Sequence, residues 1–363
     1  MSPKVITSRI SSKGGKMKHI WSLRAFLSFV FTGILLAGGV LSASAAGPIT
    51  LKLANYRPPS GYASDSDAWF AQEVQKRTNG RVKIDIFWSE TAAKQKEFPE
   101  LARTGALDMI VYPLSLSPSL FPLNGGPNAT VLQFQIQEEA IKVNRQLYES
   151  IPAMQEEYKK QNVKPVSFSA GLPYHLLSKT QIKTVDDLRG RKIRSWGAFV
   201  PGVWQKVGAV PVTINIPDLY DGLDKGLIEI SVQDIGYVKF LKLYEVAKHF
   251  SSLNIGLPAF YQLLINLDKW NSLPADVQKI MDQVGRDRER VMVELGTKEI
   301  EQARQELKAA GVIFDEFPKE ELQKFHRLVP DTLESWVQKT GPAAKPVADL
   351  WRQLLKNMRK SES

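Results

Sequence analysis

The chain of 363 residues is long enough for two domains of ordinary size, each with its own core. It has no cysteine, which excludes disulfide bonds, cysteine metal ligands and a cysteine nucleophile. The formal charge is +10, but residues 1–45 hold six of the 48 basic side chains and no acidic one, which leaves 48 − 6 = 42 basic against 38 acidic residues, or +4. So small a charge predicts no basic face for nucleic acid.

The N-terminus has the pattern of a secretory signal peptide. From Met17 the chain reads MKHIWSLR, then AFLSFVFTGILLAGGVL, then SASAAG, which is the basic, apolar and small-residue order of such signals. We expect cleavage near Ala45 or Ala46, with residues 1–46 removed and the protein exported to the periplasm. An uncleaved anchor is the alternative, because the apolar run of roughly 17 residues is close to the ~20 that span a bilayer. Met17 is also an alternative start codon to Met1.

Strand and helix patterns alternate after the signal. Alternating apolar residues predict strands at Ile49–Tyr56 and 81–88, and the helical spacing between them predicts a helix over 64–80 that ends at Asn79-Gly80. This βαβ pattern requires a parallel sheet covered by helices. It recurs with a helix before the strand LDMIVYPL, a long helix over Gln137–Gln161 before VKPVSFSAG, a helix before VPVTINI and another before LIEISVQD. The fold class is therefore α/β.

The chain becomes almost continuously helical after Pro274. The apolar side chains of this segment predict one buried side, formed by Val277, Ile280, Met281, Val284, Val291, Leu295 and Leu307. At 1.5 Å per residue the helix is roughly 50 Å long, which exceeds one domain, so we expect it to bridge two. From Lys319 the pattern predicts two more amphipathic helices, separated by TGPAAKP.

Signatures of catalysis and cofactor binding are missing from the sequence. There is no G-x-S-x-G, P-loop, G-x-G-x-x-G or H-E-x-x-H motif, and the histidines lack metal-ligand spacing. We therefore expect a binding protein with no cofactor and no metal rather than an enzyme. An exported enzyme that uses Glu229 with His175 or His249 as its acid/base pair remains a rival hypothesis.

Several colinear segments resemble a known family. LKLANYRPPSG, LARTGALDMIV, IKTVDDLRGRKIRSWG, KVGAVPVTINIPDLYDGLDKGLIE and LINLDKWNSLPADVQKIM are similar, in order and spacing, to the DctP-type solute-binding proteins of tripartite ATP-independent periplasmic (TRAP) transporters. The resemblance covers about Ile49–Thr340. It implies a two-lobed periplasmic-binding-protein-like fold with a ligand cleft between the lobes and a long bridging helix. It also implies that the protein delivers a small carboxylate to the membrane subunits of a transporter; a ligand receptor for a sensor is the alternative.

The resemblance also implies lobe boundaries. We expect lobe I to comprise residues 47–170 and 258–300, lobe II 171–257, the bridging helix 274–310, and a C-terminal strand and helices across the lobes 311–363. The chain would cross between lobes near Ser167–Ala170 and again near Gly256–Ala259. We expect a monomer.

The segment RGRKIRSWGAF, from Arg189 to Phe199, resembles the most telling motif of the family, in which a strand ends in an arginine that holds the ligand carboxylate. Open α/β sheets bind ligands at the carboxyl ends of their strands, where Arg194 would lie. A guanidinium presents a planar fork that pairs with both carboxylate oxygens. A surface arginine near a turn is the alternative, and we assign Arg189, Arg191 and Lys192 to solvent.

The remaining site predictions concern polar and aromatic residues near strand ends. Family members that bind small dicarboxylates commonly have a further arginine where this chain reads SAGLPYHLL, which contains none. Gln233 stands where the resemblance implies a polar residue that contacts the ligand. Aromatic side chains can line a pocket for an acid with a flat or apolar body. We therefore expect an aromatic or otherwise apolar organic acid, contacted by Tyr56, Trp88, Tyr112, Tyr174, Trp196 and Tyr237; core packing is the alternative for each.

Overall fold

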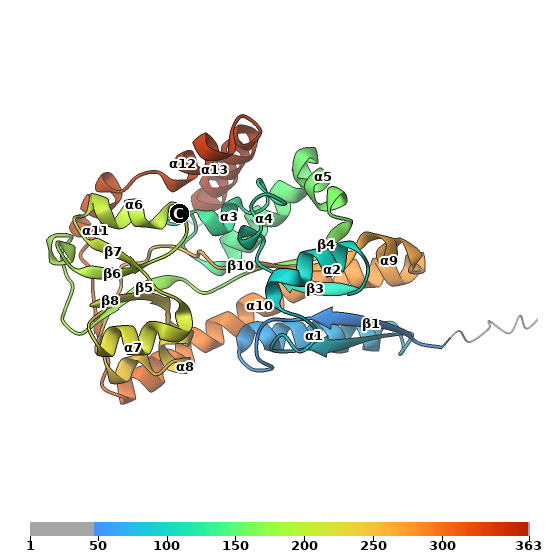
Figure 1. Cartoon of the computed structure of the whole chain (residues 1–363), viewed down its shortest axis with the longest axis horizontal. Helices are drawn as coiled ribbons and strands as arrows, with labels where there is room; N and C mark the ends of the chain where they lie inside the picture. The colour runs from blue at the N-terminus through green and yellow to red at the C-terminus, as the bar shows by residue number, and fades with distance from the viewer. Residues whose placement is uncertain (1–46, 362–363) are drawn as a thin grey trace, which may run out of the picture. The chain divides into compact units, whose positions relative to one another are not determined.

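The computed structural model describes residues 47–361 (Figure 1). The predicted signal peptide lies outside these residues, so its cleavage site stays a prediction. None of the helices within 47–361 is both long enough and apolar enough to cross a membrane.

The first sheet has five strands in the order β2-β1-β3-β10-β4. Strand β1 pairs in parallel with β2 and β3, as the βαβ pattern predicted, whereas β10 runs antiparallel to β3 and β4. The expectation of a parallel sheet is therefore wrong for β10, which returns to this sheet from the second one. The strands are β1 (Ile49–Ala54), β2 (Val82–Phe87), β3 (Met109–Tyr112), β4 (Val163–Ala170) and β10 (Phe260–Asn266).

The second sheet has six strands in the order β11-β9-β5-β8-β6-β7. Strand β6 is parallel to β7 and β8, while β5 is antiparallel to β8 and β9. Both sheets are thus mixed. The strands are β5 (Tyr174–Ser178), β6 (Lys192–Ser195), β7 (Val210–Thr213), β8 (Ile230–Asp234), β9 (His249–Ser251) and β11 (Ile313–Asp315).

Helices pack against both sheets (Figure 1). The chain leaves β4 at Ala170 and enters β5 at Tyr174, and it returns between β9 and β10. The helices are α1 (Tyr62–Arg77), α2 (Phe98–Arg103), α3 (Gly126–Ala129), α4 (Gln137–Ser150), α5 (Pro152–Lys160), α6 (Val200–Lys206), α7 (Leu219–Asp224), α8 (Ile235–Phe240), α9 (Leu267–Ser272), α10 (Ala275–Ala309), α11 (Lys319–Leu328), α12 (Thr332–Thr340) and α13 (Ala344–Ser361).

Two helix predictions are corrected by the structure. The expected helix over Gln137–Gln161 is broken between α4 and α5, because Pro152 has no N–H to continue the ladder and instead opens a new helix. The C-terminal segment forms three helices rather than two. The extra break follows α11, where Asp331 accepts hydrogen bonds from Leu333 N and Glu334 N and so starts α12.

Helix α10 connects the cores of the two sheets, as its length predicted (Figure 1). Its first turns place Val277, Met281 and Val284 in the core of the first sheet, and its last turns place Ala303 and Leu307 in a core of the second. In the middle, however, Met292 is a buried apolar residue, whereas Val291 and Leu295 are only half-buried. The predicted apolar side is therefore wrong there.

Gly285 and Gly296 explain how the middle of α10 lies so close to its neighbours. They are 11 residues apart, which is about three turns and hence nearly the same side of the helix. A Cβ on Gly285 would collide with the carbonyl oxygen of Val166 in β4, and one on Gly296 would meet the side chains of Gln137 and Leu172. The absence of side chains lets α10 lie directly against the strand that leads into the second sheet.

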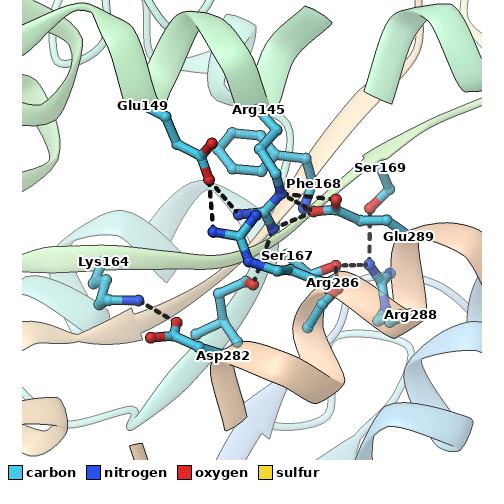
Figure 2. A network of polar contacts seen from close by, with 12 residues as sticks. Arg145, Glu149, Lys164, Ser167, Phe168, Ser169, Asp282, Arg286, Arg288 and Glu289 are labelled. Carbon is cyan, nitrogen blue, oxygen red and sulfur yellow. Dashed lines mark hydrogen bonds and ion pairs between the residues drawn. The ribbon is translucent and has the colours of Figure 1, made fainter. Parts of the chain in front are cut away.

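Buried polar contacts fix α10 to β4 and α4 (Figure 2). Glu289 accepts hydrogen bonds from Arg145 and from the backbone N–H of Phe168, the latter at 2.8 Å. Burial raises the pKa of Glu289, and the Arg145 charge opposes that rise. Because buried ion pairs need complete hydrogen bonding to be stable, this arrangement selects one position for the helix.

We predict that Gly285→Ala lowers the free energy of unfolding by roughly 1–3 kcal/mol, because the added methyl group must displace the β4 backbone. Urea unfolding followed by circular dichroism measures the change. Gly202→Ala in α6 is the matched control, because nothing lies within 4 Å of the position that a Cβ would take there. This substitution should raise the free energy of unfolding by roughly 0.5–1 kcal/mol, because alanine lowers the backbone entropy of the unfolded chain. Equal effects of the two substitutions would show that the close approach at Gly285 is unimportant.

Candidate ligand-binding site

Two cavities lie between elements of the two sheets. The smaller has a volume of about 220 Å³. Its wall is formed by residues 57–64, which include the loop after β1, by Tyr261 of β10, by the start of α8 and by Glu299 of α10. The larger has a volume of about 630 Å³ and is lined by the segment after β3, by residues 196–200 after β6 and by the end of α12. Both cavities thus include residues that follow strand ends, where the sequence placed the site.

Arg194 is enclosed rather than exposed to bulk solvent. Arg194 is 5% exposed, and its Nη1 donates a hydrogen bond to the carbonyl oxygen of Val232 at 2.5 Å. The guanidinium carbon lies 4.7 Å from the ring centre of Trp196. Its Nε has no hydrogen-bond acceptor among the described residues. Burial lowers the pKa of Arg194, and the neighbouring Tyr174 opposes this effect.

Arg194 is not itself among the residues that line either cavity. Two of its neighbours do line them. Trp196 lines the larger cavity. Tyr237 lines the smaller one and lies near enough to Arg194 for the guanidinium charge to oppose the rise in its pKa. Tyr174 packs edge-on against Trp196, with ring centres 5.6 Å apart. Burial raises the pKa of Tyr174, so its hydroxyl stays protonated and can donate at neutral pH.

Asp234 was not identified from the sequence, although it directly follows Gln233 at the end of β8. Its carboxylate caps α8 by accepting a hydrogen bond from Tyr237 N at 3.0 Å. The residue is 3% exposed and lines the smaller cavity. Burial raises the pKa of Asp234 to about 7, and the Glu299 charge adds to the rise, whereas the backbone hydrogen bonds and Arg194 oppose it.

Arg57 is a second missed residue, in the loop that the sequence shows only as a Pro/Gly-rich connection. It lines the smaller cavity and is 7% exposed. Its guanidinium carbon lies 5.5 Å from the ring centre of Tyr56 and 4.6 Å from that of Tyr261, and it forms an ion pair with Asp67. Its only signal in the sequence was a basic residue directly after a predicted strand.

Gln233 and Tyr56 also lie near these groups. Gln233 is fully buried; its Oε1 accepts a hydrogen bond from Asp234 N at 3.0 Å, and its Nε2 has no partner in residues 47–361. Tyr56 is half-buried. Arg57 and Tyr237 both lie near enough to influence its pKa electrostatically. The structure therefore brings together six of the predicted residues, Tyr56, Tyr174, Arg194, Trp196, Gln233 and Tyr237.

Tyr112 and Trp88 lie apart from this group. Tyr112 is 1% exposed and packs in a core cluster with Phe98 and Phe121, and its hydroxyl is 2.7 Å from Ser117 Oγ. Trp88 follows the edge strand β2, is half-buried and lines neither cavity. Core packing accounts for Tyr112, and nothing in the position of Trp88 supports a ligand contact.

The acid/base groups of the enzyme hypothesis do not form a pair. Glu229 is ion-paired with Arg191 at 2.9 Å, and His249 Nδ1 lies 2.8 Å from Asp315. His175 is half-buried and its ring lies against that of Phe250, and desolvation lowers its pKa to about 4. Within 47–361, no cluster of three or more His, Asp or Glu side chains could hold a metal ion.

Residues 60–339 match the family model DctP, described as "Bacterial extracellular solute-binding protein, family 7". The chain belongs to this family, which confirms the resemblance to TRAP solute-binding proteins.

Three relatives illustrate the similarity. The C4-dicarboxylate-binding periplasmic protein DctP of Rhodobacter capsulatus is 24% identical over 84% of this chain and 88% of its own. A TRAP periplasmic solute-binding protein from Desulfovibrio salexigens aligns with a TM-score of 0.77 at 22% identity, covering 85% of this chain and 96% of its own. A TRAP solute-binding protein from Rhodoferax ferrireducens, solved with copurified benzoate, aligns with a TM-score of 0.74 at 20% identity, covering 87% of this chain and 100% of its own. These structures confirm the α/β, two-lobed fold with its long bridging helix.

We predict that Asp234→Asn stabilises the protein at pH 8 more than at pH 5. The folded-state pKa of Asp234 is about 7, above its ordinary 3.8. Protonated Asp234 therefore favours folding fully below pH ~4, and this contribution is lost as the pH rises through 7. Asparagine keeps the helix cap without a buried charge.

Urea unfolding at both pH values measures the difference between the variant and the wild type. His175 also titrates differently on unfolding, but it is present in both proteins and cancels. A gain of the same size at pH 5 and pH 8 would contradict the prediction.

Proposed function

We propose that this protein binds a small organic acid between its lobes, through the carboxylate, and delivers it to the membrane subunits of a TRAP transporter. Arg194 is the carboxylate-binding residue in this proposal. The observation that carries it is a guanidinium that is 5% exposed and whose Nε has no hydrogen-bond acceptor among the described residues. A buried N–H without an acceptor is unfavourable, so an incoming carboxylate would find an enclosed partner with hydrogen-bonding capacity to spare.

The residues around Arg194 favour an acid with a flat or apolar body. Tyr174 and Trp196 present aromatic surface beside the guanidinium, and their contact fixes both rings. Such rings supply large contact area, and the tyrosine hydroxyl supplies a polar tip. Among solved relatives, those with benzoate and orotic acid hold acids of this kind, whereas others hold pyroglutamic acid, glucuronate or galacturonate.

Delivery requires that the lobes open and close. A ligand stabilises the closed arrangement only by contacts that the open arrangement lacks. Groups from both lobes supply such contacts in this proposal, since Tyr56 follows a strand of the first sheet and Arg194 lies in the second. Export to the periplasm belongs to this proposal, because the family is extracellular and the N-terminus has the pattern of a signal peptide.

We predict that Arg194→Ala weakens binding of the natural ligand roughly 30- to several-thousand-fold, because breaking a desolvated charge pair costs ~2–5 kcal/mol. Arg194→Lys should also bind poorly, since lysine lacks the planar fork. The ligand is first identified by native mass spectrometry of freshly purified protein and then titrated calorimetrically. Arg189→Ala, at an exposed residue of the same segment, is the matched control. Near wild-type affinity in Arg194→Ala would remove Arg194 from its assigned role.

We predict that flat acids stabilise the protein against heat more than compact aliphatic diacids do. A thermal-shift screen compares benzoate and orotate with succinate and malate at equal concentration. The reason is the aromatic surface beside Arg194, which an aliphatic chain contacts less completely. Strong stabilisation by succinate or malate, with none by the aromatic acids, would overturn this assignment.

A further inference from the structure

A cluster of buried charges beside the smaller cavity is unbalanced. The carboxylate of Asp67 lies between the guanidiniums of Arg57 and Arg288, and the three residues are 0%, 7% and 0% exposed, respectively. Asn55 Nδ2 donates to the same carboxylate at 2.7 Å. Two positive charges against one negative charge leave this buried cluster with a net charge of +1.

Arg57 has two nitrogens without a hydrogen-bond acceptor among the described residues, and Arg288 has one, its Nε. Arg288 donates to Asp67 Oδ1 at 2.5 Å and to the hydroxyls of Ser167 and Ser169 at 3.0 and 3.2 Å. Arg57 donates to Asp67 through Nη2, but its Nε and Nη1 have no acceptor among the residues that the structure describes. An enclosed guanidinium with two nitrogens that donate no hydrogen bond is costly, and an acceptor would reduce that cost.

The other charges on the wall of this cavity do not compensate Arg57. Lys239 is paired with Glu299 at 2.9 Å. Asp234 is already engaged in capping α8. The rings of Tyr56 and Tyr261 lie over the guanidinium, which leaves its edge as the place for a hydrogen-bond acceptor.

We propose that Arg57 is a second anion-binding residue, so that the solute carries an acceptor group besides the carboxylate assigned to Arg194. The inference rests on the proposed function and narrows its ligand class to flat acids with a second carboxylate or a carbonyl group. Arg57 follows a strand of the first sheet, and Arg194 lies in the second. Tyr237 lies near both, since each guanidinium charge opposes the rise in its pKa. Such a ligand would connect the two lobes through one guanidinium on each side.

The test uses two probes of matched shape that differ by one carboxylate, benzoate and terephthalate. We expect the wild-type protein to bind terephthalate roughly 10- to 100-fold more tightly than benzoate, the range for one charge-assisted hydrogen-bonding group. Arg57→Met keeps an unbranched apolar stem and removes the charge, and it should lose this preference while benzoate binding is largely retained. Lys239→Met is the matched control, because it removes a cation that lines the same cavity but is already paired.

Folding of the variants is checked by circular dichroism. Asp67 keeps Arg288 and Asn55 as partners, so Arg57→Met should fold; Arg57→Lys is the second variant, which keeps the charge but should lose most of the preference because it lacks the planar fork.

The outcomes separate this inference from the proposed function. The inference is overturned if terephthalate is not preferred by the wild-type protein, or if Arg57→Met weakens both acids equally. The proposed function still stands in those cases when Arg194→Ala abolishes benzoate binding. If Arg194→Ala leaves benzoate binding intact while Arg57→Met removes the terephthalate preference, Arg194 loses its role and Arg57 keeps its own. Failure of the wild-type protein to bind either acid contradicts the inference.

Discussion

The carboxylate of Asp67 is the interaction on which scaffold and site both depend. It accepts hydrogen bonds from the loop after β1, through Asn55 and Arg57, and from α10, through Arg288. Burial would raise the pKa of Asp67, but the two guanidiniums lower it, so the group stays ionised. The same buried charge that holds α10 against α1 therefore also fixes the orientation of Arg57 at the cavity wall.

Helix α10 is held differently at its two ends. Toward the first sheet, directional contacts such as Glu289 with Arg145 and Arg288 with Ser167 fix its position (Figure 2). Toward the second sheet, Ala303 and Leu307 pack in an apolar cluster, with the Lys239–Glu299 ion pair beside it. Apolar contacts are not directional and tolerate small shifts better than hydrogen bonds do. The contacts of α10 with the second sheet are therefore less directional than its contacts with the first.

Local patterns in the sequence predicted elements better than they predicted pairing. The alternation of strands and helices, the helix end at Asn79-Gly80 and the 35-residue helix α10 all follow from spacing within a short window. The antiparallel course of β5 and β10 does not, because the partner of a strand is chosen by long-range packing rather than by its own residues. The break at Pro152 had a local signal that the apolar periodicity around it obscured.

The site shows the same division between residue type and environment. Strand ends selected Trp196 and Tyr237, which line the two cavities, and Arg194, which lies beside Trp196, but the same rule also selected Tyr112, whose side chain packs into the core. A strand end fixes where a residue lies along the sheet, but it does not fix which face of the sheet the side chain points to. Arg57 and Asp234 were missed because their chemistry comes from distant residues: a shared carboxylate at Asp67 in one case, and enclosure beside Glu299 in the other. Enclosure is what turns an ordinary loop arginine into a candidate ligand contact, and no window of neighbouring residues encodes it.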